Sequence, residues 1–209
     1  MAMFPLGSVL FPYMPLPLRV FEDRYLVMLS KILQDEPAEF GVVLIERGQE
    51  VGGGEKRFHL GTVAQITQLE AADGFVGVVA QGERRIEIVD WLDEDPYPQA
   101  SIRVIEELQW EEELQPLRDN AEAVVRRTLA MASEFVEQTW SPDVELSTDP
   151  GVSAWQLAGI APLGPIDQVA LLRCTSMRQL LESVIELTEA ARDSFTTGWD
   201  DELDDPGEQ

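Results

Sequence analysis

Prolines dominate the first 20 residues, and they restrict what this part of the chain can form. Pro5, Pro12, Pro15 and Pro17 interrupt short apolar segments that otherwise have the composition of β-strands. Because proline has no backbone N–H to donate to a sheet, such strands belong at a sheet edge or at the start of a strand. We therefore expect the chain to begin with two edge strands.

An amphipathic helix and a series of strands follow. Over residues 22–36 apolar side chains recur at three- and four-residue steps, which predicts one apolar helix stripe made of Tyr25, Leu26, Leu29, Ile32 and Leu33. Short apolar or alternating segments then predict strands over residues 39–46, 60–69, 75–80, 84–91 and 100–105. Asp73-Gly74 predicts a hairpin turn, residues 81–83 predict a second turn, and the glycine-rich residues 48–56 predict a flexible connection.

The second half of the chain has helical periodicity. One long helix is expected from residue 111 to about 140, an acidic segment with prolines from 141 to 150 breaks it, and three shorter helices are expected over 155–161, 166–174 and 176–195. Ser176 is a suitable N-cap for the last helix. These patterns divide the chain into a β-rich part, 1–108, a helical part, 109–195, and an acidic tail, 196–209, that we expect to be disordered.

The charge of the chain limits its partners. The chain has 39 acidic and 15 basic residues and a formal net charge of −24, which disfavours both a nucleic-acid backbone and an anionic membrane surface. One cysteine, Cys174, cannot form an internal disulfide, and the pattern around it favours a small buried helix residue. Without a signal-peptide pattern or an apolar run of about 18 residues, the chain is expected to be cytoplasmic.

Several local motifs occur in an order that resembles the amino-terminal, substrate-binding domain of Lon proteases. The paired proline strands are followed by Phe21-Glu22-Asp23-Arg24-Tyr25, similar to an F-E-x-R-Y helix start, and by Gly61-Thr62-Val63-Ala64, similar to a G-T-x-A strand. Further similar segments are Phe40-Gly41-Val42-Val43, Gly82-Glu83-Arg84-Arg85, Tyr97-Pro98-Gln99-Ala100 and residues 165–172. The resemblance covers residues 3–195 and implies an α+β fold, in which a PUA-like, partly closed β-barrel with one inserted helix precedes a C-terminal helical bundle.

The chemistry of an ATP-dependent protease is missing from the sequence. A phosphate-binding loop requires a lysine after glycine, but the two lysines, Lys31 and Lys56, follow Ser30 and Glu55. Neither lysine has the buried setting that a Ser-Lys dyad requires. His59 and Cys174 are single and cannot supply the four ligands of a structural zinc site. We therefore expect no enzyme activity, no metal and no cofactor.

The remaining function is binding, and the resemblance implies recognition of exposed apolar segments of unfolded polypeptides. The aromatic and methionine side chains near turns are the candidate peptide-binding residues: Phe11, Tyr13, Met14, Trp91 and Tyr97. The same residues could instead plug the ends of the barrel. The edge strand at residues 14–20 and the junction of the two halves are the expected contact surfaces.

Other classes of function stay open at this stage. The PUA-like fold suggests RNA by analogy, but the adjacent pair Arg84-Arg85 is followed by acidic residues, which disfavours nucleic acid. A second alternative is a small ligand in a cleft between barrel and bundle. A third is an adaptor that docks on a separate protease or ATPase through the acidic tail.

Overall fold

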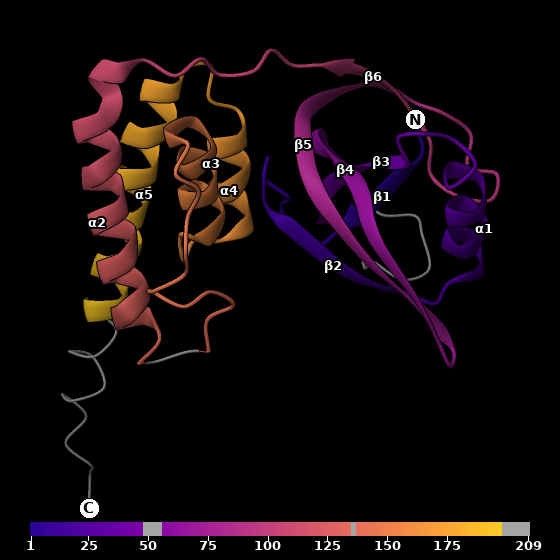
Figure 1. The fold of residues 1–209 in the computed structure, drawn as a ribbon, viewed down its shortest axis with the longest axis horizontal. Helices are drawn as coiled ribbons and strands as arrows, with labels where there is room; N and C mark the ends of the chain where they lie inside the picture. Colours follow the sequence, from indigo (N-terminus) through magenta and orange to yellow (C-terminus); the bar gives the residue numbers. More distant parts are fainter. Residues whose placement is uncertain (48–55, 135–136, 198–209) are drawn as a thin grey trace, which may run out of the picture. The chain divides into compact units, whose positions relative to one another are not determined.

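Six strands form one mixed β-sheet in the computed structural model, which describes residues 1–47, 56–134 and 137–197 (Figure 1). The strands are β1 (Met3–Leu6), β2 (Pro15–Val20), β3 (Glu39–Arg47), β4 (Lys56–Ala72), β5 (Phe75–Trp91) and β6 (Ala100–Val104). Their order is β1-β3-β4-β5-β2, with β6 also paired to β5, and β1 runs parallel to β3 while the other pairs are antiparallel. With the helices described below, this confirms the predicted α+β class.

The two ends of the sheet are linked by hydrogen bonds near the amino terminus. The Met3 N–H donates to the Pro98 carbonyl at 2.9 Å, and Ala2 forms an antiparallel bridge with Gln99. The Met1 ammonium donates to the Ala100 carbonyl at 2.8 Å, and the Ala100 N–H donates back at 3.0 Å. Buried side chains beneath this link form one core cluster: Met3, Val43, Val63, Ile86, Ile88 and Ala100.

The hairpin predicted at Asp73-Gly74 is confirmed, but the turn predicted at residues 81–83 is wrong. Ala72 pairs with Phe75 across the first turn, where Gly74 has a φ of +84°. Strand β5 continues without interruption through Gly82, whose N–H donates to the Met14 carbonyl and whose carbonyl accepts from Tyr13 N–H. A Cβ on Gly82 would lie 2.1 Å from the Phe11 carbonyl oxygen, so this glycine permits a close approach of two backbones rather than a turn.

Helix α1 (Asp23–Ile32) is shorter than the predicted 22–36, although its buried stripe includes the expected Tyr25 and Leu29. The Tyr25 ring stacks on Phe4 with centroids 4.0 Å apart, which holds the helix against the sheet. After Ile32 the backbone tightens into turns, in which the Gln34 and Asp35 N–H groups donate to the Lys31 and Ile32 carbonyls. The predicted connection at 48–56 lies almost entirely outside the described residues.

The contacts divide the described chain into two units. The first is Met1–Glu107 with Gln168–Arg173, and the second is Leu108–Asp167 with the chain from Cys174 onward. In the second unit, α2 (Gln115–Ala132), α3 (Pro150–Ile160) and α5 (Met177–Thr197) pack on one another after a short 3-10 helix, η1 (Glu112–Leu114) (Figure 1). Within the described ranges, none of the helices has the length and apolar character needed to cross a bilayer.

Two helix boundaries in this unit differ from the predictions. Helix α2 ends at Ala132, earlier than the predicted residue 140. At this end the Ser133 hydroxyl donates to the Leu129 carbonyl at 2.7 Å. Helix α3 begins at Pro150 instead of residue 155, because the Asp149 side chain accepts from the Val152 N–H at 2.9 Å and proline suits the first helical turn. The Ser176 cap is confirmed by a 3.1 Å bond from the Gln179 N–H. The tail residues 198–209 lie outside the described part of the chain.

Helix α4 (Pro165–Leu172) ends on a buried arginine of β5. The Arg85 side chain, 4% exposed, donates to the Leu172 carbonyl at 2.8 Å and to the Glu106 carbonyl at 3.0 Å. A cation at this place complements the partial negative charge of the helix C-terminus. Cys174 is buried as predicted, but it lies two residues beyond the helix and not within it.

Candidate functional site

An apolar surface is built by three neighbouring strands of the first unit. Directly paired residues of antiparallel strands lie on the same face of a sheet, so the register identifies which side chains share it. Along β2, Leu16, Leu18 and Val20 pair with Ala80, Val78 and Val76 of β5, which in turn pair with Ile66, Leu69 and Ala71 of β4. We call these nine residues the β2–β5–β4 apolar face.

This face is only partly covered in the described structure. Val20, Val78 and Ala80 are buried, but Leu16, Leu18, Ile66 and Val76 are half-buried and Leu69 is 43% exposed. The reverse face of the same strands is more polar and carries Gln65, Gln68, Glu70, Gln81 and Arg19. The apolar face has no charged or amide side chain, whereas the reverse face mixes such groups with Pro15, Pro17, Val79 and Phe75, so the two faces differ in character.

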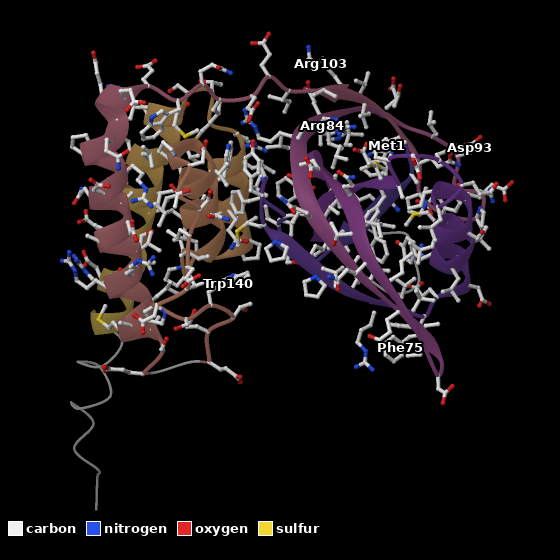
Figure 2. The ribbon with its side chains drawn as sticks, in the orientation of Figure 1. Met1, Phe75, Arg84, Asp93, Arg103 and Trp140 are labelled. Carbon is white, nitrogen blue, oxygen red and sulfur yellow. The ribbon has the colours of Figure 1, made fainter. Side chains whose placement is uncertain are left out.

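Two carboxylates lie near one end of the apolar face, beyond the Val20–Val76 pair. Asp23 begins the helix that follows β2, and Asp73 lies in the hairpin turn between β4 and β5; both are exposed. The guanidinium of Arg19 lies 4.2 Å from the centre of the Phe75 ring, at the end of the hairpin (Figure 2), and both residues belong to the reverse face. A ligand on the apolar face therefore meets acidic groups at this end.

Three of the five residues predicted to bind peptide are buried. Phe11 is 1%, Tyr97 6% and Met14 7% exposed, so these side chains offer almost no surface to a ligand. Tyr13 is half-buried, has a φ of +63°, and donates its hydroxyl to Glu107 at 2.5 Å. Trp91 is also half-buried and packs under Arg57 at 4.4 Å. The structure brings neither Tyr13 nor Trp91 onto the β2–β5–β4 apolar face.

The residues that form the apolar face did carry a sequence signal. Leu16, Leu18 and Val20 alternate with Pro17 and Arg19, which is the period of a strand with one apolar face. The alternation in β4 is obscured by an irregularity of the register between Ile66 and Gln68. For this reason Leu69 does not appear in the sequence as part of the same face.

The outer edge of β2 has few hydrogen-bond donors. The bond from the Gly82 N–H to the Met14 carbonyl means that even-numbered residues of β2 point their backbone groups toward β5. Pro15, Pro17 and Arg19 therefore point their backbone atoms to the open side. Only Arg19 has an N–H there, so strand addition at residues 14–20 would lack most of its donors.

The basic and titratable side chains considered in the sequence are engaged with neighbours. Arg84 binds Glu39 through two nitrogens at 2.8 and 2.5 Å, and this hydrogen bond raises the pKa of the Arg84 guanidinium. Lys56 pairs with Glu46 at 3.4 Å, and Lys31 lies 5.1 Å from the centre of the Tyr97 ring. His59 lies on β4 with its Nδ1 3.4 Å from the Ile88 carbonyl.

Comparison with protein families places this geometry in a known group. Residues 1–190 match the model of the ATP-dependent protease La (LON) substrate-binding domain. The chain is 26% identical over 191 residues to Lon protease 2 of Myxococcus xanthus, covering 90% of this chain and 23% of that protein. It is 28% identical over 192 residues to Lon protease 2 of Herpetosiphon aurantiacus, covering 90% of this chain and 22% of the relative. The chain thus spans less than a quarter of these relatives, and its residues 1–190 match the substrate-binding domain.

Solved structures share the fold. A Lon N-terminal domain protein from Xanthomonas campestris superposes with a TM-score of 0.62 at 24% identity, covering 89% of this chain and 96% of the other. The N-terminal domain of a Mycobacterium avium complex Lon protease gives 0.63 at 19% identity, covering 90% and 97%. At these identities the likeness supports the fold alone.

Proposed function

The chain belongs to the family of ATP-dependent protease La (LON) substrate-binding domains, and from this we propose that it captures exposed apolar segments of unfolded polypeptides. The observation that carries the proposal is the partly exposed β2–β5–β4 apolar face. Apolar segments are exposed in unfolded chains and buried in folded ones, so an apolar surface distinguishes the two states. The module binds and does no chemistry.

The architecture supports this proposal. The hydrogen bonds of residues 1–3 with residues 98–100 fit a partly closed, PUA-like barrel, with the β4–β5 hairpin extending from it (Figure 1). The sheet pairing fixes the backbone that carries these leucines and valines, so binding costs little backbone entropy on the side of this protein. Tyr13 and Trp91, half-buried elsewhere on the first unit, are proposed as secondary contacts.

Charge favours basic clients over nucleic acid or anionic membranes. With Asp23 and Asp73 near one end of the face and a net charge of −24, lysines and arginines next to an apolar segment would be attracted. The adjacent arginines offer little to a phosphate, because Arg84 is paired with Glu39 and Arg85 is buried. We propose a cytoplasmic location on the basis of the single buried Cys174.

The test measures capture of an unfolded basic protein. Lysozyme aggregates when its disulfides are reduced, and light scattering follows this with increasing amounts of the chain at low and moderate salt. We expect suppression at near-stoichiometric ratios, weaker at higher salt because the flanking charges are screened. Labelled, reduced and alkylated lysozyme then gives a Kd by fluorescence anisotropy.

A matched pair of substitutions locates the surface. Leu69 on the apolar face is 43% exposed and Leu33 after α1 is 44% exposed, so L69S and L33S remove similar areas. Full burial of a leucine is worth about 2 kcal/mol, and burial of the exposed part of Leu69 about 1 kcal/mol, or about fivefold in Kd. We expect L69S to weaken binding about fivefold and L33S to leave it unchanged. Equal effects of the two substitutions would contradict the assignment of the face, and absence of capture by the unaltered chain would contradict the function.

A further inference from the structure

The outer edge of β6, unlike that of β2, keeps its backbone hydrogen-bond donors. The Ile105 N–H donates to the Arg85 carbonyl, so the odd-numbered residues Arg103 and Ile105 point their backbone groups toward β5. The even-numbered residues Ala100, Ile102 and Val104 point theirs to the other side. The mutual bonds between Ala100 and Met1 confirm this alternation.

Beyond Ala100 this edge is open. Among the described residues, no strand pairs with the outer N–H and C=O groups of Ile102 and Val104. Both residues have an N–H, unlike Pro15 and Pro17 at the equivalent positions of β2. Next to the pair of Met1 with Ala100, two further donors and two further acceptors at Ile102 and Val104 thus have no strand partner in the described part of the chain.

The side chains of this edge are also suited to pairing. Ile102 packs against the core cluster, while Val104 pairs with the fully buried Ile86 yet is itself 51% exposed. A strand that paired with Ile102 and Val104 would place apolar side chains directly opposite them. Such a strand would cover Val104 and extend the core.

We propose that the β6 edge at residues 102–104 binds an extended segment of the polypeptide client by antiparallel strand addition. This inference rests on the proposed function, which identifies the bound segment as part of an unfolded client. It adds where the client binds and that its backbone is extended. The direction follows from the antiparallel pairing of Met1 with Ala100, which an added strand would continue. The amino end of the segment would then lie beside exposed Glu106 and Glu107, so basic residues are expected there.

A second copy of this chain fits the edge less well. Two β6 strands paired about a twofold axis at Arg103 would bring the two Arg103 side chains opposite one another. Arg103 is exposed and bonds Glu87 of its own sheet (Figure 2). Like charges directly opposite destabilise a strand pair, and two chains of charge −24 repel each other.

The test replaces the outward donor at Val104. The substitution V104P removes this N–H but no bond to β5, because residue 104 points away from β5, as Pro15 and Pro17 do on β2. V104T keeps the N–H and the branched shape and is the matched control. The probe is a fluorescein-labelled synthetic peptide of two lysines followed by alternating valine and threonine, measured by anisotropy. A second peptide has N-methylated valines, which cannot donate.

We expect V104P to weaken peptide binding about five- to tenfold, V104T less than twofold, and N-methylation to weaken binding to the unaltered chain at least tenfold. Circular dichroism of V104P checks the fold, and the methylated peptide tests the inference without any substitution. Equal binding of both peptides would overturn strand addition, while capture of reduced lysozyme would still support the proposed function. If the peptide bound by strand addition but the chain did not capture reduced lysozyme, an unfolded client would not be the occupant of the edge. The same conclusion would follow if sedimentation showed a dimer of the unaltered chain that V104P abolished, because the occupant would then be a second copy.

Discussion

Replacing Gly82 by alanine tests whether the long strand β5 depends on a close approach of two backbones. The added Cβ would lie 2.1 Å from the Phe11 carbonyl oxygen and 3.2 Å from the Leu10 side chain. The oxygen belongs to the backbone and cannot rotate away as a flexible side chain would. The two segments must therefore separate by more than 1 Å to restore an ordinary contact.

The expected cost follows from what this separation breaks. The Tyr13 N–H donates to the Gly82 carbonyl at 2.7 Å, and the Gly82 N–H donates to the Met14 carbonyl at 2.9 Å. Each bond contributes about 1 kcal/mol, and partial exposure of Phe11 adds about 1 kcal/mol. G82A should thus lower the free energy of unfolding by about 3 kcal/mol, a large fraction of the 5–15 kcal/mol typical of a domain.

Urea unfolding followed by circular dichroism measures this change, with hydrogen exchange of β5 peptides to locate it. With a slope of about 2 kcal/mol per M, the midpoint should fall by about 1.5 M. The control is Gly77 in the same strand, where an added Cβ would meet its nearest atom at 3.5 Å. G77A should be neutral or stabilising by up to about 1 kcal/mol. A loss below 1 kcal/mol in G82A, or equal losses in both variants, would refute the reasoning.

Two further substitutions test single contacts. R85L leaves the Leu172 and Glu106 carbonyls without their buried donor and should lower the free energy of unfolding in urea by about 3 kcal/mol. R84L, at an exposed pair, should lower it by less than about 1 kcal/mol. Equal losses in the two variants would contradict the role of Arg85. D149A removes the cap of α3 and should cost about 1 kcal/mol, and D143A, at an exposed loop position, should be neutral; a neutral D149A would show that Pro150 alone fixes the helix start.

Local patterns predicted most elements of the fold, because period-2 and period-3.6 spacing report which side of an element is apolar. They could not predict the course of β5 through Gly82, because the reason for that glycine is a contact with Phe11, about 70 residues away in the chain. The burial of Phe11, Met14 and Tyr97 was likewise beyond the sequence, since an aromatic residue near a turn suits both a core and a binding surface. The prolines of β2 were placed correctly at an edge, but which of their atoms face outward depends on the register with β5.

Strands β2 and β6 lie one after the other along the side of β5 that is opposite to β4, and their outer edges are managed by different means. Proline leaves Arg19 as the only residue of β2 with an outward N–H, so that edge is a poor template for a strand, whether from a client or from a second copy. At β6 the donors remain, and an open edge of this kind would ordinarily promote aggregation. At β6, we propose that charge distinguishes a client strand from a second copy of the chain. A second copy brings a net charge of −24 and an Arg103 opposite Arg103, whereas a basic client meets Glu106 and Glu107. The acid excess, which alone indicates only solubility, would then keep the edge free of copies of the chain while leaving it available to basic unfolded segments.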